Sequence, residues 1–301
     1  MLFRSPTFPD RLADAVRRNG PLCVGIDPRW ESLPSEMIER HSDNDLVGIA
    51  AAFEEFSLRV LELVRPYCGV IKPQSAFFEL VGPDGMRAMK RVLYQAKQMG
   101  YVTILDAKRG DIASTATAYA DAAFGGMTGP CGVIPVWNAD SLTVNPYLGA
   151  DAVEPFITSA VKTDRGLFVL VRTSNPGGGL FQNLVCDGRP LYRHVAEAVA
   201  KWNEPTLGDC GLGAVGAVVG ATHPQELAEL RTALPNVWFL VPGYGAQGGT
   251  AADVKPAYRA DGLGAVVNSS RGITFPFHRD DPHWEAKIIA AAKQANSELQ
   301  N

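Results

Sequence analysis

Short apolar segments alternate with amphipathic segments along most of the chain. Eight apolar runs are rich in valine, isoleucine and leucine, and they are continuous rather than alternating: 22–27, 69–74, 101–108, 141–147, 166–174, 213–222, 237–243 and 264–270. Strands that are buried on both faces have this composition. The runs therefore predict a parallel sheet that is covered by helices.

The segments between these runs have helical periodicity. In residues 45–66, apolar side chains recur every three or four positions from Leu46 to Val64, and Pro66 ends the pattern. Further helices are predicted at 84–99, 149–161, 189–203, 224–233 and 281–296.

Eight strands that are each followed by a crossover predict an α/β fold, a single (β/α)8 TIM barrel, with residues 1–301 as one catalytic domain. A doubly wound sheet is the alternative, but DPRWESLP stands where the first strand of that fold would lead into a glycine-rich turn. Two connections, 126–140 and 175–190, exceed ordinary loop length, which is typical of functional or mobile segments.

The composition of the chain argues against several classes of partner, namely nucleic acid, membrane and metal ions. The net charge of −4 argues against a nucleic-acid partner, although a local group of Lys and Arg can still bind a small anion. No apolar run approaches the ~18 residues that a membrane span needs, and the N-terminus lacks the apolar region of a secretory signal. The five cysteines form no Cys-x-x-Cys pair, which predicts reduced thiols, no zinc or other metal site, and a cytoplasmic protein.

Polar residues gather where the predicted strands end. Asp27 ends the first strand, Lys72 lies in the second, and the third runs into Asp106 and Lys108. Because active sites of these barrels lie at the carboxyl ends of the strands, we expect the polar side chains to meet there.

The segment ILDAKRGDIAST, residues 104–115, is the most informative. Residues two apart lie on the same face of a strand, so Asp106 and Lys108 share a face, and Asp111 follows in the turn before the next helix. With Lys72 from the neighbouring strand, they predict an array of alternating charges. The alternative is a solvated strand end, with ion pairs that contribute ~0–1 kcal/mol each.

A second segment, PGYGAQGG at 242–249, predicts an anion site. Its glycines let backbone N–H groups approach a phosphate, a helix is expected to start at about Thr250, and Arg271 after the eighth strand adds a bidentate donor. Taken alone, the segment is equally compatible with a plain loop. Its position beside the eighth strand favours phosphate binding.

These motifs together resemble the orotidine 5′-phosphate decarboxylase family, over roughly residues 20–275. The set consists of VGIDP (24–28), IKPQ (71–74), LDAKRGDIAST (105–115), VNPY (144–147), RTSNPG (172–177), VVGATHP (218–224), VPGYGAQGG (241–249) and SSRGI (269–273). The IKPQ and TSNPGG forms resemble the longer, bacterial-type branch. The resemblance implies a cofactor-free and metal-free enzyme that converts orotidine 5′-phosphate to uridine 5′-monophosphate and CO₂.

The resemblance also implies a role for each matching residue. The catalytic set is Lys72, Asp106 beside the departing carboxylate, Lys108 as proton donor to C6, and Asp111, which the family contributes across a homodimer interface. The substrate-binding set is Asp27 on the ribose, Ser174 on the pyrimidine, Gln247 and Arg271 on the phosphate, with Thr115, Pro242 and Gly248. No nucleic acid or membrane is expected as a partner.

Three other functions fit parts of the pattern. A magnesium-dependent sugar-phosphate decarboxylase or synthase shares the Asp-x-Lys core, but here Lys72 stands where a metal site would want an acid. A Schiff-base aldolase needs a neutral lysine, whereas Asp106 and Asp111 favour the charged form. A non-catalytic nucleotide-binding barrel would not need every catalytic position to be filled.

Overall fold

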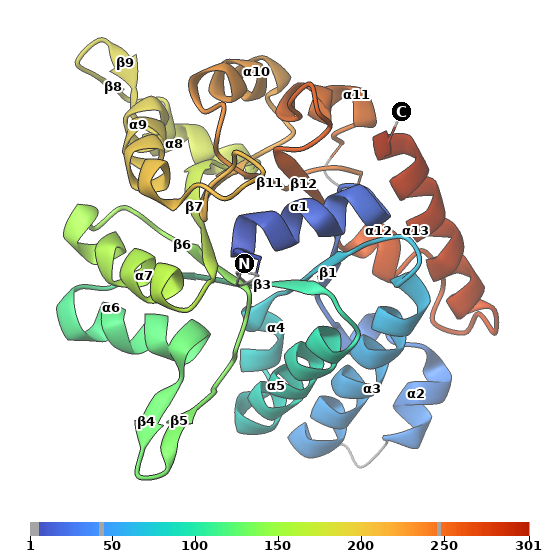
Figure 1. Ribbon diagram of the computed structural model, residues 1–301. Coiled ribbons are helices and arrows are strands. Elements are labelled where there is room, and N and C mark those ends of the chain that lie inside the picture. The colour runs from blue at the N-terminus through green and yellow to red at the C-terminus, as the bar shows by residue number, and fades with distance from the viewer. Residues whose placement is uncertain (1–5, 42–44, 246–247, 301) are drawn as a thin grey trace, which may run out of the picture.

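The computed structural model describes residues 6–41, 45–245 and 248–300, and eight parallel strands close into a barrel within them. Figure 1 shows the barrel ringed by helices. The neighbouring strands run in the order β1, β12, β11, β10, β7, β6, β3 and β2 around the barrel. Their bounds are β1 Leu22–Ile26, β2 Val70–Pro73, β3 Val102–Arg109, β6 Ser141–Val144, β7 Gly166–Arg172, β10 Val215–Val219, β11 Phe239–Val241 and β12 Ala265–Ser269. Each lies within one predicted run apart from the last residue of β3, so the barrel prediction is confirmed.

The predicted helices are present, with ends that shift by a few residues. They are α3 Leu46–Val64, α5 Gly82–Gln98, α7 Ala150–Lys162, α9 Leu191–Asn203, α10 Pro224–Ala233 and α13 Trp284–Gln300. Two more helices follow where a helix start was expected, after Asp111 and at about Thr250: α6 Ala113–Ala120 and α11 Ala251–Val254. Others were not predicted individually: α1 Phe8–Asn19, α2 Ser35–Arg40, α4 Ser75–Glu79, α8 Gly179–Gln182 and α12 Arg271–Thr274. A π-helical turn at Asp121–Gly125 and several 3-10 turns complete the helical set.

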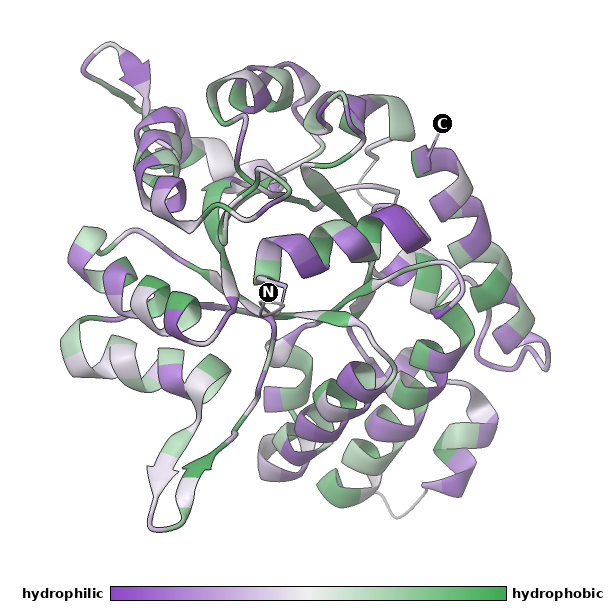
Figure 2. Cartoon of the chain, in the orientation of Figure 1, coloured by the Kyte–Doolittle hydropathy of each residue, from purple (hydrophilic) through white to green (hydrophobic). Residues whose placement is uncertain are grey.

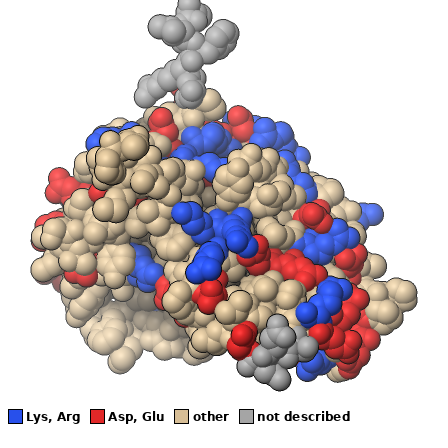
Figure 3. Space-filling model, turned by 90° about the horizontal axis from the view of Figure 1, so that it is seen from below, with Lys and Arg blue, Asp and Glu red and all other residues tan. Residues whose placement is uncertain are grey.

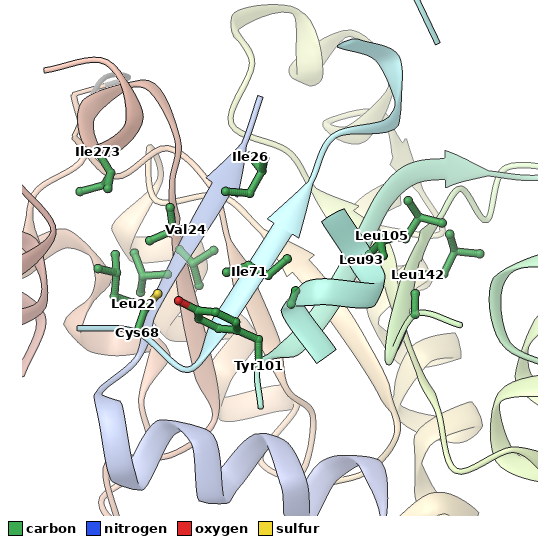
Figure 4. Packing of buried hydrophobic residues seen from close by; sticks show 14 of the residues in the cluster. Leu22, Val24, Ile26, Cys68, Ile71, Leu93, Tyr101, Leu105, Leu142 and Ile273 are labelled. Atoms are coloured by element: carbon green, nitrogen blue, oxygen red, sulfur yellow. The ribbon is translucent and has the colours of Figure 1, made fainter. Parts of the chain in front are cut away.

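Alternate residues of each strand separate two hydrophobic layers. Outward-facing residues such as Val24, Ile71 and Leu105 pack against the helices, and Figure 4 shows them with Leu93 of α5. Inward-facing residues such as Val70 and Ile104 fill the barrel. Figure 2 shows hydrophobic and hydrophilic residues alternating along most of the helices that surround the barrel.

Helix α1 closes the amino-terminal end of the barrel. Figure 1 shows it lying across that opening, and Phe8 and Leu12 belong to the same cluster as the inward-facing strand residues. Gly166 at the start of β7 is required here, because a Cβ atom would lie 2.1 Å from the Phe8 ring. The barrel is therefore filled and closed below, and only its carboxyl end is open to a substrate.

The two long connections each contain a small hairpin. Strands β4 Met127–Gly129 and β5 Gly132–Ile134 pair antiparallel after α6, and β8 Val185–Cys186 pairs with β9 Arg189–Pro190 after β7. Figure 1 shows both hairpins projecting from the barrel. The connections are ordered structures rather than plain loops.

Surface charge is mixed. On the face shown in Figure 3, Lys and Arg side chains lie beside Asp and Glu rather than forming one basic surface. All five cysteines are free thiols, as predicted. No helix in the part of the chain that the structure describes is long and apolar enough to cross a membrane.

Candidate active site

A cavity of about 300 Å³ opens at the carboxyl ends of the barrel strands. Its walls contain the predicted residues Asp27, Lys72, Asp106, Lys108, Ser174 and Pro242. They also contain polar residues to which the sequence analysis gave no individual role: Gln74, Thr143, Thr173, Asn175, Asn268 and Ser270. Of these, Thr173 and Ser270 were expected at this end of the barrel, because they lie at the ends of predicted strands. Side chains from all eight strands, or from the segments directly after them, thus line one space.

Strand geometry places the charged residues. Lys72 follows the inward-facing Val70 by two positions, and Asp106 follows Ile104 in the same way, so both point into the barrel above its apolar filling. Both are about 5% exposed. Charged side chains that are buried to this extent require ion-pair or hydrogen-bond partners.

Asp106 has those partners on both carboxylate oxygens. Its Oδ2 lies 2.6 Å from Lys72 Nζ and 3.1 Å from Gln74 Nε2, which both donate to it. Its Oδ1 accepts from Lys108 Nζ at 2.7 Å and from Thr143 Oγ1 at 2.9 Å. The predicted alternating array therefore exists as Lys72–Asp106–Lys108.

The array fixes its own protonation states. Burial alone would raise the pKa of Asp106, but the charges of Lys72 and Lys108 outweigh it and hold that pKa well below its ordinary value. Burial alone would lower the pKa of Lys72, yet the neighbouring Asp106 and Asp27 raise it. At neutral pH the site thus holds a carboxylate between two cationic side chains.

Lys108 does not continue the strand regularly. Four steps along β3, from Leu105 to Arg109, match only two along β6, from Leu142 to Val144. Lys108 takes a φ of 46°, in the left-handed region that favours glycine. Its side chain is about half exposed and reaches back to Asp106 across this irregularity.

Asp27 and its neighbours form another part of the wall. One carboxylate oxygen of Asp27, Oδ1, is buried without a hydrogen-bond partner in the protein. Such an atom calls for a donor from a ligand or water. Ser270 comes close to β1 because Gly25 has no side chain there: a Cβ would lie 1.9 Å from the serine Oγ.

The predicted phosphate segment is only partly described. Gln247 lies outside the described residues, and Gly248 is exposed, with its N–H donated to the Gly245 carbonyl. Thr250 caps the next helix through a capping box, as expected, but that helix, α11, is only four residues long. Arg271 is exposed at the start of α12, directly after the cavity residue Ser270, and does not line the cavity itself.

Asp111 and Thr115 lie outside the cavity of their own chain. The Asp111 carboxylate accepts the Ile112 N–H at 2.8 Å, and Thr115 is exposed in the first turn of α6. Within the described part of the chain, neither side chain makes a hydrogen bond or ion pair with the Lys72–Asp106–Lys108 array. Within 6–41, 45–245 and 248–300, no three His, Cys, Asp or Glu side chains are grouped to hold a metal ion.

Some missed residues carried a recognisable signal. Gln74 follows Lys72 by two positions and so shares its face, and Asn268 and Ser270 alternate along the end of β12. Thr143 carried no such signal, because the register between β3 and β6 decides where its hydroxyl lies.

Comparison with known proteins gives one consistent family. A family model described as orotidine 5′-phosphate decarboxylase / HUMPS family matches residues 20–286. A protein named orotidine 5′-phosphate decarboxylase from Rhodopirellula baltica is 46% identical, over 97% of this chain and 99% of the relative. One of the same name from Clostridium kluyveri is 37% identical, over 90% of this chain and 89% of its own.

Solved structures agree with the sequence relatives. The structure of Leishmania donovani OMP decarboxylase is 36% identical and superimposes with a TM-score of 0.76, covering 98% of this chain and 97% of that one. The OMP decarboxylase from Methanocaldococcus jannaschii, at 19% identity and a TM-score of 0.63, shares the fold.

Proposed function

The chain belongs to the orotidine 5′-phosphate decarboxylase / HUMPS family, and we propose which of its residues carry out the decarboxylation. The reaction converts orotidine 5′-phosphate to uridine 5′-monophosphate and CO₂, the last step in making that nucleotide. The observation that carries the assignment of residues is the buried Lys72–Asp106–Lys108 array at the open end of the barrel.

The chemical step needs charge stabilisation above all. The bond between C6 and the carboxylate breaks, its electron pair stays on C6, and neutral CO₂ leaves. In our proposal the Lys108 ammonium lies beside C6, stabilises the developing carbanion and then gives it a proton. Lysine is left neutral and is reprotonated from solvent.

Asp106 has two roles in this proposal. Its ionised carboxylate holds the ammonium groups of Lys72 and Lys108 in place, at 2.6 and 2.7 Å. It also lies where it would repel the substrate carboxylate, and that repulsion would be relieved as CO₂ departs. The low pKa of Asp106 supports both roles, because the carboxyl is ionised at neutral pH.

The remaining residues would bind the parts of the substrate that do not react. The unpartnered Oδ1 of Asp27 suits a ribose hydroxyl, and Ser174 suits the pyrimidine. Gln247, Gly248 and Arg271 are proposed for the phosphate and Pro242 for the wall between the phosphate and the ring. Binding energy from the distant phosphate can then be used to position C6 over Lys108.

The whole protein is proposed to act as a cytoplasmic homodimer, with residues 1–301 as one catalytic domain. Asp111 and Thr115 would enter the site of the partner copy. Large apolar side chains beside them support this: Ile112 is 54% exposed and Tyr147 is 82% exposed. The loops that carry them are joined by the Asn145 N–H and the Arg109 carbonyl.

The direct test mixes purified protein with orotidine 5′-phosphate and follows the absorbance of the pyrimidine together with CO₂ release. We expect stoichiometric uridine 5′-monophosphate, no loss of rate with EDTA, and no covalent adduct on borohydride treatment. Absence of turnover would refute the proposed function. EDTA-sensitive turnover of a sugar phosphate would favour the magnesium-dependent alternative, and borohydride trapping would favour the aldolase.

A further inference from the structure

A single buried hydroxyl connects three consecutive residues of β3, of which Asp106 and Lys108 line the site. Thr143 lies on β6, is 1% exposed and lines the cavity. Its Oγ1 accepts the backbone N–H of Ala107 at 3.0 Å and of Lys108 at 2.9 Å. The same hydroxyl donates to Asp106 Oδ1 at 2.9 Å. One oxygen thus makes three hydrogen bonds.

The irregular register explains why those bonds are needed. β3 has two more residues than β6 between the matched pairs at Leu105 and Arg109, so regular ladder bonds are not available to Ala107 and Lys108. Thr143 Oγ1 takes the place of a carbonyl acceptor for both N–H groups. Without it, two partly buried backbone hydrogen bonds would lose their acceptor, and the left-handed turn at Lys108 would lose its support.

The hydroxyl also has a fixed direction. Because Oγ1 uses its lone pairs on the two N–H groups, its only proton points to Asp106 Oδ1. That carboxylate oxygen also accepts from Lys108 Nζ at 2.7 Å. Thr143 is therefore bonded to the backbone of Lys108 and to the counter-ion of its ammonium group.

We infer that Thr143 is a positioning residue, whose hydroxyl sets the backbone turn of Lys108 and the orientation of Asp106 so that the ammonium group meets the reacting carbon. The inference rests on the proposed function, because it concerns the geometry of the same site. This role needs no contact between Thr143 and the reacting atoms. Thr143 acts through Asp106 and Lys108.

The test separates the hydroxyl from the methyl group. Four proteins are compared: wild type, Thr143→Ser, Thr143→Val and Thr143→Ala. The hydroxyl is removed in the step from Thr to Val and again in the step from Ser to Ala. We expect both steps to lower kcat for orotidine 5′-phosphate by about ten- to a hundredfold, with KM within about threefold, since small misplacements of catalytic groups cost this much. Thr143→Ser should keep kcat within about threefold.

Thr103 provides a matched control. It is another fully buried strand threonine whose hydroxyl bonds to a carboxylate, at 3.1 Å from Asp140 Oδ2, and also accepts a backbone N–H. Thr103→Val should lower Tm without lowering kcat. If the kcat of Thr143→Val stays within threefold of wild type, the inference is wrong. It is also wrong if Thr143→Ser lowers kcat as much as Thr143→Val does. If Thr143→Val does not fold, the comparison of kcat between Thr143→Ser and Thr143→Ala decides alone.

A readout without turnover keeps the inference separate from the proposed function. Amide hydrogen exchange at Ala107 and Lys108 should accelerate at least tenfold in Thr143→Val and Thr143→Ala, and stay near wild type in Thr143→Ser. If the wild type does not act on orotidine 5′-phosphate, the proposed function fails, whereas the exchange rates still test the positioning. Unchanged exchange at both amides would overturn it.

Discussion

At the scale of single residues, Asp106 organises the charged part of the site, because four donors converge on the two oxygens of this buried carboxylate. Lys72 and Gln74 hold one oxygen, and Lys108 and Thr143 hold the other. A carboxylate held in this way cannot rotate, so the two ammonium groups are fixed relative to each other. That preorganisation is what electrostatic catalysis requires.

Removing the proposed proton donor should stop the reaction with little effect on the fold. Lys108 is about half exposed at the end of β3 and contributes little to the core. The kcat of Lys108→Ala should therefore be at least about a thousandfold lower than that of wild type. General acid–base catalysis typically contributes about 10²–10⁴-fold, so this loss exceeds the lower limit of that range. Turnover is measured under single-turnover conditions, and Tm should stay within a few degrees. Near-normal turnover would remove Lys108 from the role.

Removing the charge of Asp106 should destabilise the protein in a pH-dependent way. Asp106→Asn leaves Lys72 buried without its closest counter-ion, which costs about 3–5 kcal/mol in comparable sites. A carboxyl whose pKa is lower in the folded chain stabilises it above its unfolded pKa of about 3.9, and that contribution is lost as pH falls through the folded pKa.

The difference in unfolding free energy between wild type and Asp106→Asn should thus be constant from pH 7 to about pH 4 and shrink only below it. Urea titrations at several pH values measure it, down to the lowest pH at which both proteins fold. Asp151→Asn, at an exposed carboxyl, is the control and should change stability by less than about 0.5 kcal/mol. A difference that already shrinks above pH 5 would contradict a depressed pKa.

The direction of single side chains could be predicted from the sequence where the two-residue repeat of a β-strand was sufficient. Lys72 and Asp106 point inward because each follows an inward-facing apolar residue by two positions. Thr143 was missed because its role depends on how β3 and β6 are aligned, and no local pattern encodes that register. The assigned roles of the phosphate residues stay predictions.

At the scale of elements, the segment after β7 is tied to the strand that precedes it. Gln182 of α8 accepts the Thr173 N–H at 3.0 Å through its Oε1 and donates to Thr173 Oγ1 at 2.7 Å. Arg172 Nη1 also donates to this Oε1, and Arg172 itself is paired with Glu226 of α10. Since Thr173 and Asn175 line the cavity, one side chain connects the long segment to the site.

Gln182→Leu should therefore loosen the segment and weaken substrate binding. It removes partners from the Thr173 N–H and from Arg172, which costs about 1–3 kcal/mol of stability. KM for orotidine 5′-phosphate should rise about tenfold, equal to ~1.4 kcal/mol, with a smaller change in kcat. Limited proteolysis should cut within 175–190 sooner than in wild type.

Asn183→Ala is the matched control. The Asn183 side chain adjoins Gln182, is exposed, and makes no hydrogen bond within the described part of the chain. It should leave KM and the cleavage pattern unchanged. Equal effects of the two substitutions would show that the segment responds to any change of sequence, and that the connection through Gln182 has no specific role.

Elements were predicted well where they are long and buried. The eight strands are continuous apolar runs, and α3 shows its period over nineteen residues. Short elements such as α11 and α12, of four residues each, have too few turns to show a period. The hairpins within 126–140 and 175–190 have strands of two or three residues, so only tertiary context defines them.

At the scale of the whole molecule, filling one end of the barrel determines where chemistry can occur. Helix α1 and the inward-facing apolar residues close the amino-terminal end, and charged residues line the carboxyl end. The sequence predicted this polarity because the polar residues follow the strands in chain order. It did not predict α1 as the closure, since an amphipathic helix before the first strand can pack on several surfaces.

A partner copy is proposed to supply the remaining part of the site. Among the described residues of one chain, the Asp111 carboxylate accepts a hydrogen bond only from the Ile112 N–H, while Ile112, Tyr147 and Leu148 beside it are each more than half exposed. Isologous dimers bury such a surface against its own copy. In the proposed homodimer, Asp111 and Thr115 of each copy would then enter the site that holds the partner copy's Lys72–Asp106–Lys108 array.

Subunit complementation tests this arrangement. Lys108→Ala and Asp111→Ala chains, each expected to be inactive alone, are mixed and allowed to exchange. Each heterodimer would hold one site with both defects and one with neither. Half of the dimers are mixed and half of their sites are intact, so random exchange should restore about a quarter of wild-type activity per total site. Lys108→Ala mixed with Asp106→Asn is the control and should restore none, because both defects lie in the same half of each site. If exchange is complete, as labelled subunits would show, and the first mixture stays inactive, the two copies do not share their sites.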